Sequence, residues 1–114
     1  MFKFERLKVY DKANELLDFI EGRLHRIGKE DRYSLGEQLK RASLAIPTNI
    51  AEATSRESPK EEKYFYNVAK GSVYEVVSLV KVMQRRGYIE QEEYQKIYKL
   101  AEEIAKMLSG LLNK

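Results

Sequence analysis

A row of cations with one tyrosine among them is the feature of this sequence best suited to a chemical task. At 100° per residue of an α-helix, three lysines fall within about 20° of one line, and two further cations lie beside them. The row contains no glutamate and consists of Lys60, Lys63, Lys70, Tyr74, Lys81 and Arg85. Ammonium groups bind phosphates, and a tyrosine ring offers a surface for base stacking. The row predicts a surface that binds RNA or DNA, and the alternative of a solvated helix face stays open.

Residues for catalysis or metal binding are scarce. The chain has no cysteine and one histidine, so thiol chemistry, thiolate metal sites and catalytic triads lack a required group. Di-iron bundles use Glu-x-x-His pairs at i and i+3, whereas the glutamate before His25 is Glu21, at i−4. His25 is expected on the surface near a helix end. We therefore predict that the protein is not an enzyme and has no metal or cofactor.

The overall charge and hydropathy point to no membrane partner. Lysine and arginine exceed aspartate and glutamate by 21 to 18, a surplus too small to imply nucleic acid by itself. No apolar run approaches the roughly 20 residues that span a bilayer, and the N-terminal segment lacks the apolar middle of a signal peptide. We expect a cytoplasmic protein.

Apolar residues repeat at the three- and four-residue spacing of an α-helix in four segments. The segments cover about 5–27, ending at Gly28, then 34–56, then 59 to the residues before Gly87, and finally about 90–112. The expected core rows are Tyr10, Ala13, Leu17, Ile20, Leu24 and Ile27; Leu35, Leu39, Ala42, Ile46, Ile50 and Ala53; Phe65, Val68, Ser72, Val76, Leu79 and Met83; and Tyr94, Ile97, Ala101, Ile104, Leu108 and Leu111. A second row of Tyr98, Ala105 and Leu112 widens the face of the last segment.

Local signals mark where these helices begin and bend. Ser34 and Glu37 have the spacing of a capping box, and Pro59 after Ser58 suits the first position of a helix. Pro47 is expected to bend the second helix rather than divide it, because the apolar spacing continues beyond it. Four helices joined by short turns predict an all-α, antiparallel up-down-up-down four-helix bundle, with residues 1–114 as one domain.

Some apolar residues are expected outside the core, at a contact between subunits. Leu44 projects from nearly the opposite side of the second helix to its core row, next to Thr48 and Ala51. Phe19 points away from the first core row, among charged residues. Apolar side chains outside a core favour association, so these four residues predict a homo-oligomer.

Polar residues at the edge of the core are expected to hold the second and third helices in place. The periodicity puts Glu75 at the margin of the core, where a carboxylate needs a partner such as Arg41, Asn49 or Arg56. An amide among apolar residues commonly sets register, which is the expectation for Asn49. A structural role is favoured over catalysis for Arg41, Asn49, Glu52, Arg56 and Glu75.

Two stretches carry a resemblance to a known family. RASLAIPTNIAEATSR (41–56) and YNVAKGSVYEV (66–76) resemble the four-helix bundle proteins encoded by intervening sequences of bacterial 23S rRNA genes. The family usually has glycine after the Ala-Glu pair, where this chain has Ala53. The resemblance implies a four-helix bundle. Through it the chain is also similar to the accessory protein of diversity-generating retroelements. That accessory protein is a basic, ring-shaped pentamer that binds nucleic acid and a reverse transcriptase, so the resemblance alone implies a pentamer and such a partner.

Two hypotheses of function follow. The leading one is a non-enzymatic, oligomeric accessory protein that binds the backbone of RNA or DNA through the basic row without reading sequence. The alternative is a protein-binding or scaffolding oligomer whose lysines only keep it soluble. A small catalytic bundle is a third and weaker possibility.

Overall fold

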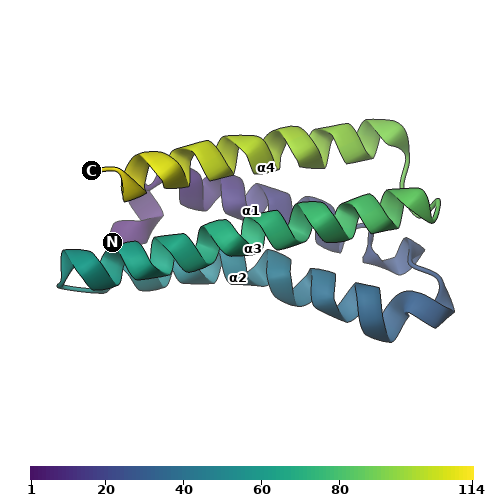
Figure 1. Ribbon diagram of the computed structural model, residues 1–114, viewed down its shortest axis with the longest axis horizontal. Helices are drawn as coiled ribbons and strands as arrows, with labels where there is room; N and C mark the ends of the chain where they lie inside the picture. The colour runs from purple at the N-terminus through teal and green to yellow at the C-terminus, as the bar shows by residue number, and fades with distance from the viewer.

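The computed structural model describes residues 1–114, which form four α-helices and no strand. The helices are Lys8–Glu21 (α1), Glu37–Thr54 (α2), Pro59–Arg85 (α3) and Gln91–Leu112 (α4). Figure 1 shows them side by side along the long axis of the molecule, which measures 44 × 25 × 24 Å. α1 packs against α2 and α4, and α3 packs against the same two helices. The prediction of an all-helical protein with four helices is confirmed.

The segment expected as one helix over 5–27 is divided into several pieces. α1 ends at Glu21, where the amide of Gly22 donates to the carbonyl of Asp18 at 3.0 Å. Short 3₁₀ turns precede and follow it at Lys3–Arg6, Leu24–Arg26 and Lys29–Asp31. The expected helix end at Gly28 is therefore wrong. Gly28 instead leaves room for the side chain of Tyr88, because a Cβ at position 28 would lie only 2.8 Å from the Tyr88 hydroxyl oxygen.

The capping box expected at the start of the second helix does not form. The chain enters α2 through a π-helical turn at Arg32–Gly36, in which the amide of Glu37 donates to the carbonyl of Ser34. Because a backbone carbonyl in this turn already accepts from the Glu37 amide, that amide needs no side-chain cap. The Ser34 hydroxyl Oγ instead donates to the carbonyl of Asp31 at 3.3 Å. α2 then continues through Pro47 to Thr54. The proline does not divide the helix, as predicted.

Both ends of α3 agree with the sequence signals. Ser58 Oγ accepts a hydrogen bond from the amide of Glu61 at 3.3 Å, with Pro59 at the first helical position. Gly87 follows the helix in the left-handed conformation, at φ 76°. Glycine is favoured there because it has no Cβ to oppose that conformation.

One core of 24 buried residues takes side chains from all four helices. The rows expected for α2 and α4 are buried, except that Leu111 is half-buried. In α3 the expected row is wrong at four of its six positions, and the buried side chains are Tyr66, Ala69, Val73, Val76, Val80 and Met83. α3 packs against two helices, so its apolar residues occupy two adjacent rows, and spacing alone does not reveal which row is central. Phe65 and Leu79 are half-buried on its flank.

The polar residues expected between α2 and α3 mostly bond within their own helix. Glu75 and Arg41 are exposed and form no hydrogen bond or ion pair, so the expected partnership at the core margin is wrong. The expected position of Glu75 is measured from the predicted core row of α3. Most of the residues that are actually buried lie one position further along the helix, which moves Glu75 out to the solvent side. Asn49 Nδ2 donates to the carbonyl of Ala45 at 2.8 Å, and Glu52 of α2 pairs with Arg56 in the turn that follows the helix.

One residue of that polar set does join the two helices. The guanidinium of Arg56 lies 4.7 Å from the ring centroid of Phe65 on α3. Such a cation–π contact contributes on the order of 0.5–1 kcal/mol at an exposed site. The contact of the α2–α3 turn with α3 is therefore between a cation and an aromatic ring rather than between opposite charges.

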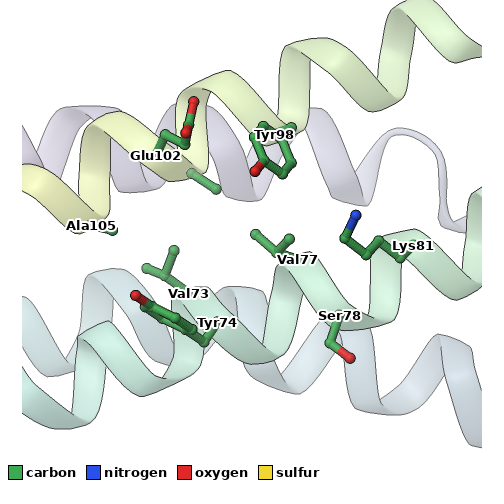
Figure 2. A pocket seen from close by; sticks show the side chains of 9 residues that line it. Val73, Tyr74, Val77, Ser78, Lys81, Tyr98, Glu102 and Ala105 are labelled. Atoms are coloured by element: carbon green, nitrogen blue, oxygen red, sulfur yellow. The ribbon is translucent and has the colours of Figure 1, made fainter.

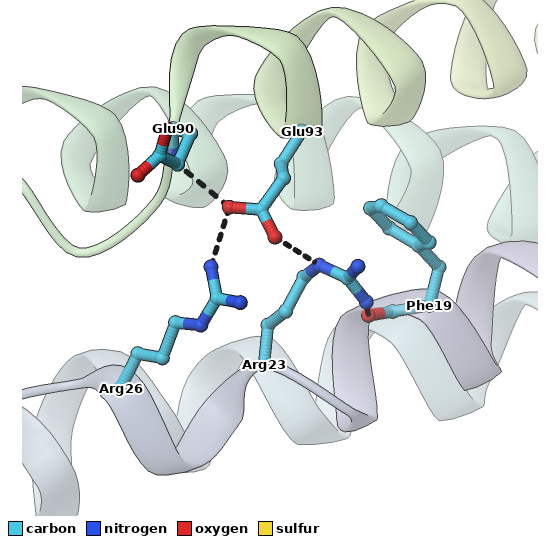
Figure 3. Close-up of polar contacts among 5 residues, drawn as sticks. All are labelled: Phe19, Arg23, Arg26, Glu90 and Glu93. Atoms are coloured by element: carbon cyan, nitrogen blue, oxygen red, sulfur yellow. Dashed lines mark hydrogen bonds and ion pairs between the residues drawn. The ribbon is translucent and has the colours of Figure 1, made fainter.

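A carboxylate at the start of α4 binds two arginines from the turns that follow α1 (Figure 3). Glu93 accepts from Arg23 Nε at 2.7 Å and from Arg26 Nη1 at 2.5 Å. It also accepts from the backbone amide of Glu90 at 2.9 Å, and Arg23 Nη1 donates to the carbonyl of Phe19 at 3.0 Å. The Glu90 amide, followed by the two arginines, lowers the pKa of Glu93 from 4.5 to about 2.

A second polar cluster joins the α1–α2 connection to the α3–α4 turn. Asp31 accepts from Arg86 Nη1 and from the hydroxyl of Tyr88, both at 2.5 Å. The Tyr88 hydrogen bond is the main cause of a lowered Asp31 pKa, and the same bond raises the pKa of Tyr88. Charge-assisted bonds of this kind are directional, so the two clusters set how the helix ends lie relative to one another.

Burial of the α2 row leads to a prediction about stability. Leu39 is fully buried, and Gln38 next to it on the same helix is exposed. Leu39→Ala is expected to lower the free energy of unfolding by about 2–5 kcal/mol, because it leaves a cavity. Gln38→Ala is the control on the same helix and should change it by about 0.5 kcal/mol or less. Urea denaturation of dilute protein measures both, and equal losses would contradict the burial described here.

The lowered pKa of Glu93 leads to a prediction about pH. A carboxylate whose pKa is depressed in the folded state stabilises the protein above its ordinary pKa, and this contribution is lost as the pH falls through the folded value. The difference in stability between the wild type and Glu93→Gln should thus be full at neutral pH and shrink between pH 4.5 and about 2. Glu21→Gln, at an exposed carboxylate without a bonded partner, serves as the control. A pH-independent Glu93→Gln difference would refute the assignment.

Candidate nucleic-acid interface

The predicted basic row lies along the outer side of α3. Lys60 and Arg85 are exposed near its two ends, and Lys63 and Lys70 are half-buried. Tyr74, between them, is 65% exposed. At 1.5 Å per residue the row extends over about 37 Å. The six residues therefore share one continuous face of a single helix, as their spacing predicted.

Two lysines of the row bond to other parts of the chain. Lys63 Nζ donates to the backbone oxygen of Lys114 at 2.9 Å. Lys81 Nζ donates to the hydroxyl of Tyr94 at 2.8 Å, and it lies 5.4 and 5.7 Å from the ring centroids of Tyr94 and Tyr98. The Tyr94 hydrogen bond raises the pKa of Lys81. These contacts hold both ammonium groups between α3 and the C-terminal part of the chain.

None of the five cations of the row forms an ion pair with a carboxylate side chain. The ion pairs of the molecule are instead Lys12–Glu103, Arg23–Glu93, Arg26–Glu93, Arg56–Glu52 and Arg86–Asp31. Because no carboxylate side chain neutralises the row, its positive charge is available to an external anion.

A hollow of about 370 Å³ adjoins the row, between α3 and α4. Figure 2 shows Val73 and Val77 pointing from α3 towards α4, with Tyr98 of α4 facing them. The full lining is Val73, Tyr74, Val77, Ser78, Lys81, Tyr98, Ala101, Glu102 and Ala105. Sequence reasoning included Tyr74 and Lys81 as site residues but missed Tyr98 and Glu102. The second apolar row on the last helix was the one signal that pointed to Tyr98.

The four residues expected at a subunit contact do not form one exposed apolar patch. Leu44 and Thr48 are exposed on α2, and Thr48 Oγ1 donates to the carbonyl of Leu44 at 3.1 Å. Ala51 is half-buried beside the N-terminal segment, where it lines a hollow with Phe2 and other residues.

Phe19, expected outside the core at a subunit contact, is not a freely exposed ring. Its ring is half-buried, with the guanidinium carbon of Arg23 at 3.5 Å and Lys96 Nζ of α4 at 4.8 Å from its centroid. Arg23, about one turn further along the chain, and Lys96 from α4 cover its ring, because cations are attracted to an aromatic face.

No group of three or more histidine or acidic side chains is placed to hold a metal ion. None of the four helices has the length and apolar character required to cross a bilayer. The surface features that stand out are thus the basic row, the adjoining hollow and the exposed part of α2.

Comparisons with known proteins identify the family. A crystal structure of a protein with unknown function from the S23 ribosomal protein family of Bacteroides thetaiotaomicron is similar, with a TM-score of 0.85 and 24% identity over 93% of this chain and 99% of that one. This likeness supports the fold. A search of curated proteins finds no match. The model of the family described as 23S rRNA-intervening sequence protein matches residues 5–110. The match covers nearly the whole chain, and the protein therefore belongs to the 23S rRNA-intervening sequence protein family, as the stretches around Pro47 and Lys70 indicated.

Proposed function

We propose that this protein is a non-enzymatic, homo-oligomeric accessory protein of the cytoplasm that binds the phosphate backbone of RNA or DNA. One observation carries the proposal: the five cations along α3 form no ion pair with a carboxylate side chain. Phosphates are the natural partners of such a row, and each neutralised phosphate releases counterions. Backbone contacts position a nucleic acid without reading its sequence.

The cations of the row differ in whether their side chains are already bonded within the protein. The side chains of Lys60, Lys70 and Arg85 form no hydrogen bond within the chain, so their charged groups are free to follow a nucleic-acid backbone. Lys63 and Lys81 are already oriented by Lys114 and Tyr94. Ordering of a long side chain before binding lowers the entropic cost of the contact. RNA is the first ligand to test, since the names of the family and of the structural neighbour refer to ribosomal RNA and to a ribosomal protein.

The proposal includes an antiparallel up-down-up-down arrangement and assembly of several copies. Short connections between consecutive helices, and the two termini at the same end of the molecule in Figure 1, support alternating helix directions. Leu44, Thr48 and the nearby Ala51 supply the contact between copies. The pentameric state and a reverse transcriptase partner rest on the family resemblance alone.

A second candidate function is a scaffold that binds only proteins. The exposed Leu44 on α2 favours it, and so do the intramolecular bonds of Lys63 and Lys81, which occupy two cations of the row. In that case the lysines serve solubility. Nucleic-acid binding separates the two candidates.

Charge reversal along α3 tests the proposed function. The triple variant Lys60→Glu, Lys70→Glu and Arg85→Glu removes cations that hold no other part of the chain. Its affinity for RNA should fall at every salt concentration, and the slope of log affinity against log salt should decrease by about 2, from about 0.7 per lost phosphate contact on a single strand. Fluorescence anisotropy over a salt series measures both.

The matched control reverses three exposed cations outside the row, through Lys29→Glu, Lys40→Glu and Lys99→Glu. The net charge changes by the same amount in both triple variants. A loss of RNA affinity only in the α3 variant therefore identifies the row as the binding surface. Equal losses in the two triple variants, or no binding by the wild type at low salt, would remove the proposal in favour of the scaffold.

Assembly has a separate test. Light scattering is expected to give the wild type a mass that is a multiple of the chain mass, and Leu44→Glu should reduce it, because a carboxylate in an apolar contact loses its hydration. Tyr33→Glu changes another exposed apolar residue, in the turn before α2, and should leave the mass unchanged. A monomeric wild type would rule out the role assigned to Leu44.

A further inference from the structure

We propose that the hollow between α3 and α4 receives one unpaired base of a single-stranded nucleic acid, an inference that rests on the proposed function and specifies its ligand. The hollow joins the basic row directly, because Tyr74 and Lys81 belong to both. A strand that follows the cations of α3 therefore passes its opening. The question is which part of the strand fits inside.

The lining suits the flat face of a base. Its floor is apolar, made by Val73 and Val77 from α3 and by Ala101 and Ala105 from α4, and Tyr74 and Tyr98 contribute one ring from each helix (Figure 2). Its volume of about 370 Å³ lies in the lower part of the range of roughly 300–1,000 Å³ for small-ligand sites. Tyr74 packs against no other aromatic ring in the protein, so its face is free for stacking.

The charges around the hollow favour a base inside and phosphates outside. Glu102 lines the hollow and pairs with no cation. A carboxylate repels a phosphate but accepts hydrogen bonds from the amino and ring N–H groups of a base. Lys70 precedes Tyr74 by about one helical turn, and Lys81 follows it by about two turns. The phosphates on either side of an inserted base would thus each find a cation.

A duplex does not fit this arrangement. Its bases are stacked and paired, and extracting one has an energetic cost that a single strand avoids. The inference therefore predicts that the tyrosines contribute to the binding of single strands and leave duplex binding, which depends on phosphate contacts alone, unchanged.

Tyr74→Ala is the principal test, with Tyr64→Ala as its control. The two tyrosines lie on the same helix and are 65% and 63% exposed, but Tyr64 is outside the hollow. Tyr74→Ala should weaken the binding of a fluorescent oligoadenylate RNA by about 5-fold or more, as expected for one lost stacking contact. The salt slope should stay at the wild-type value, because no phosphate contact is lost. Tyr64→Ala should match the wild type, and Tyr74→Phe should retain most of the affinity.

A second measurement reports insertion itself. A fluorescent adenine analogue within the strand should lose emission on binding to the wild type, because its emission falls on stacking, and should keep it on binding to Tyr74→Ala. Tyr98→Ala, which removes the ring on the α4 side of the hollow, should also reduce the loss of emission on binding. The same variants assayed with the complementary duplex should all bind as the wild type does, and circular dichroism checks that each is folded.

The outcomes separate this inference from the proposed function. Salt-dependent binding with equal affinities for Tyr74→Ala and Tyr64→Ala, or an analogue whose emission does not change, overturns base insertion while backbone binding through α3 stands. Absence of binding to single strands and to duplex at low salt overturns the proposed function and the base site with it.

Discussion

The packing of α3 between α2 and α4 is the constraint on which the rest of this structure depends. α3 is the longest helix, its buried row faces the common core, and its flanks contact both neighbours. The remaining side of α3 faces solvent, and the cations from Lys60 to Arg85 lie along its border with α4. Because this side borders α4, residues of α4 take part in the surface: Tyr94 holds Lys81, while Tyr98 and Glu102 help to line the adjoining hollow.

Polar bonds complement this packing at the ends of the helices. Apolar side chains stabilise through non-directional burial, which by itself defines the position of a helix end poorly. Glu93 with its two arginines, and Asp31 with Arg86 and Tyr88, add directional contacts between segments far apart in the sequence. Figure 3 shows how one carboxylate collects bonds from three directions. The proposed binding surface on α3 therefore rests on a framework in which core burial and charge-assisted bonds have separate tasks.

The local patterns of the chain predicted much of the fold. The number of helices, the core rows of α2 and α4, the cap at Ser58 and the left-handed Gly87 could all be predicted, because each depends on neighbours within one or two helical turns. The end of α1, the π turn before α2 and the central row of α3 could not. Each of these depends on a contact from elsewhere in the chain, such as Tyr88 against Gly28 or the simultaneous packing of α3 on two helices.

The candidate site divides in the same way. The sequence by itself determined that Lys60, Lys63, Lys70, Tyr74, Lys81 and Arg85 share one helix face, because helical geometry converts spacing directly into direction. Only the tertiary structure decided which cations of that face are already bonded, that Phe19 is covered by Arg23 and Lys96, and that Tyr98 and Glu102 meet Tyr74 across a hollow. These facts require two helices to be placed side by side, and the apolar spacing of each helix leaves their relative position and rotation undetermined.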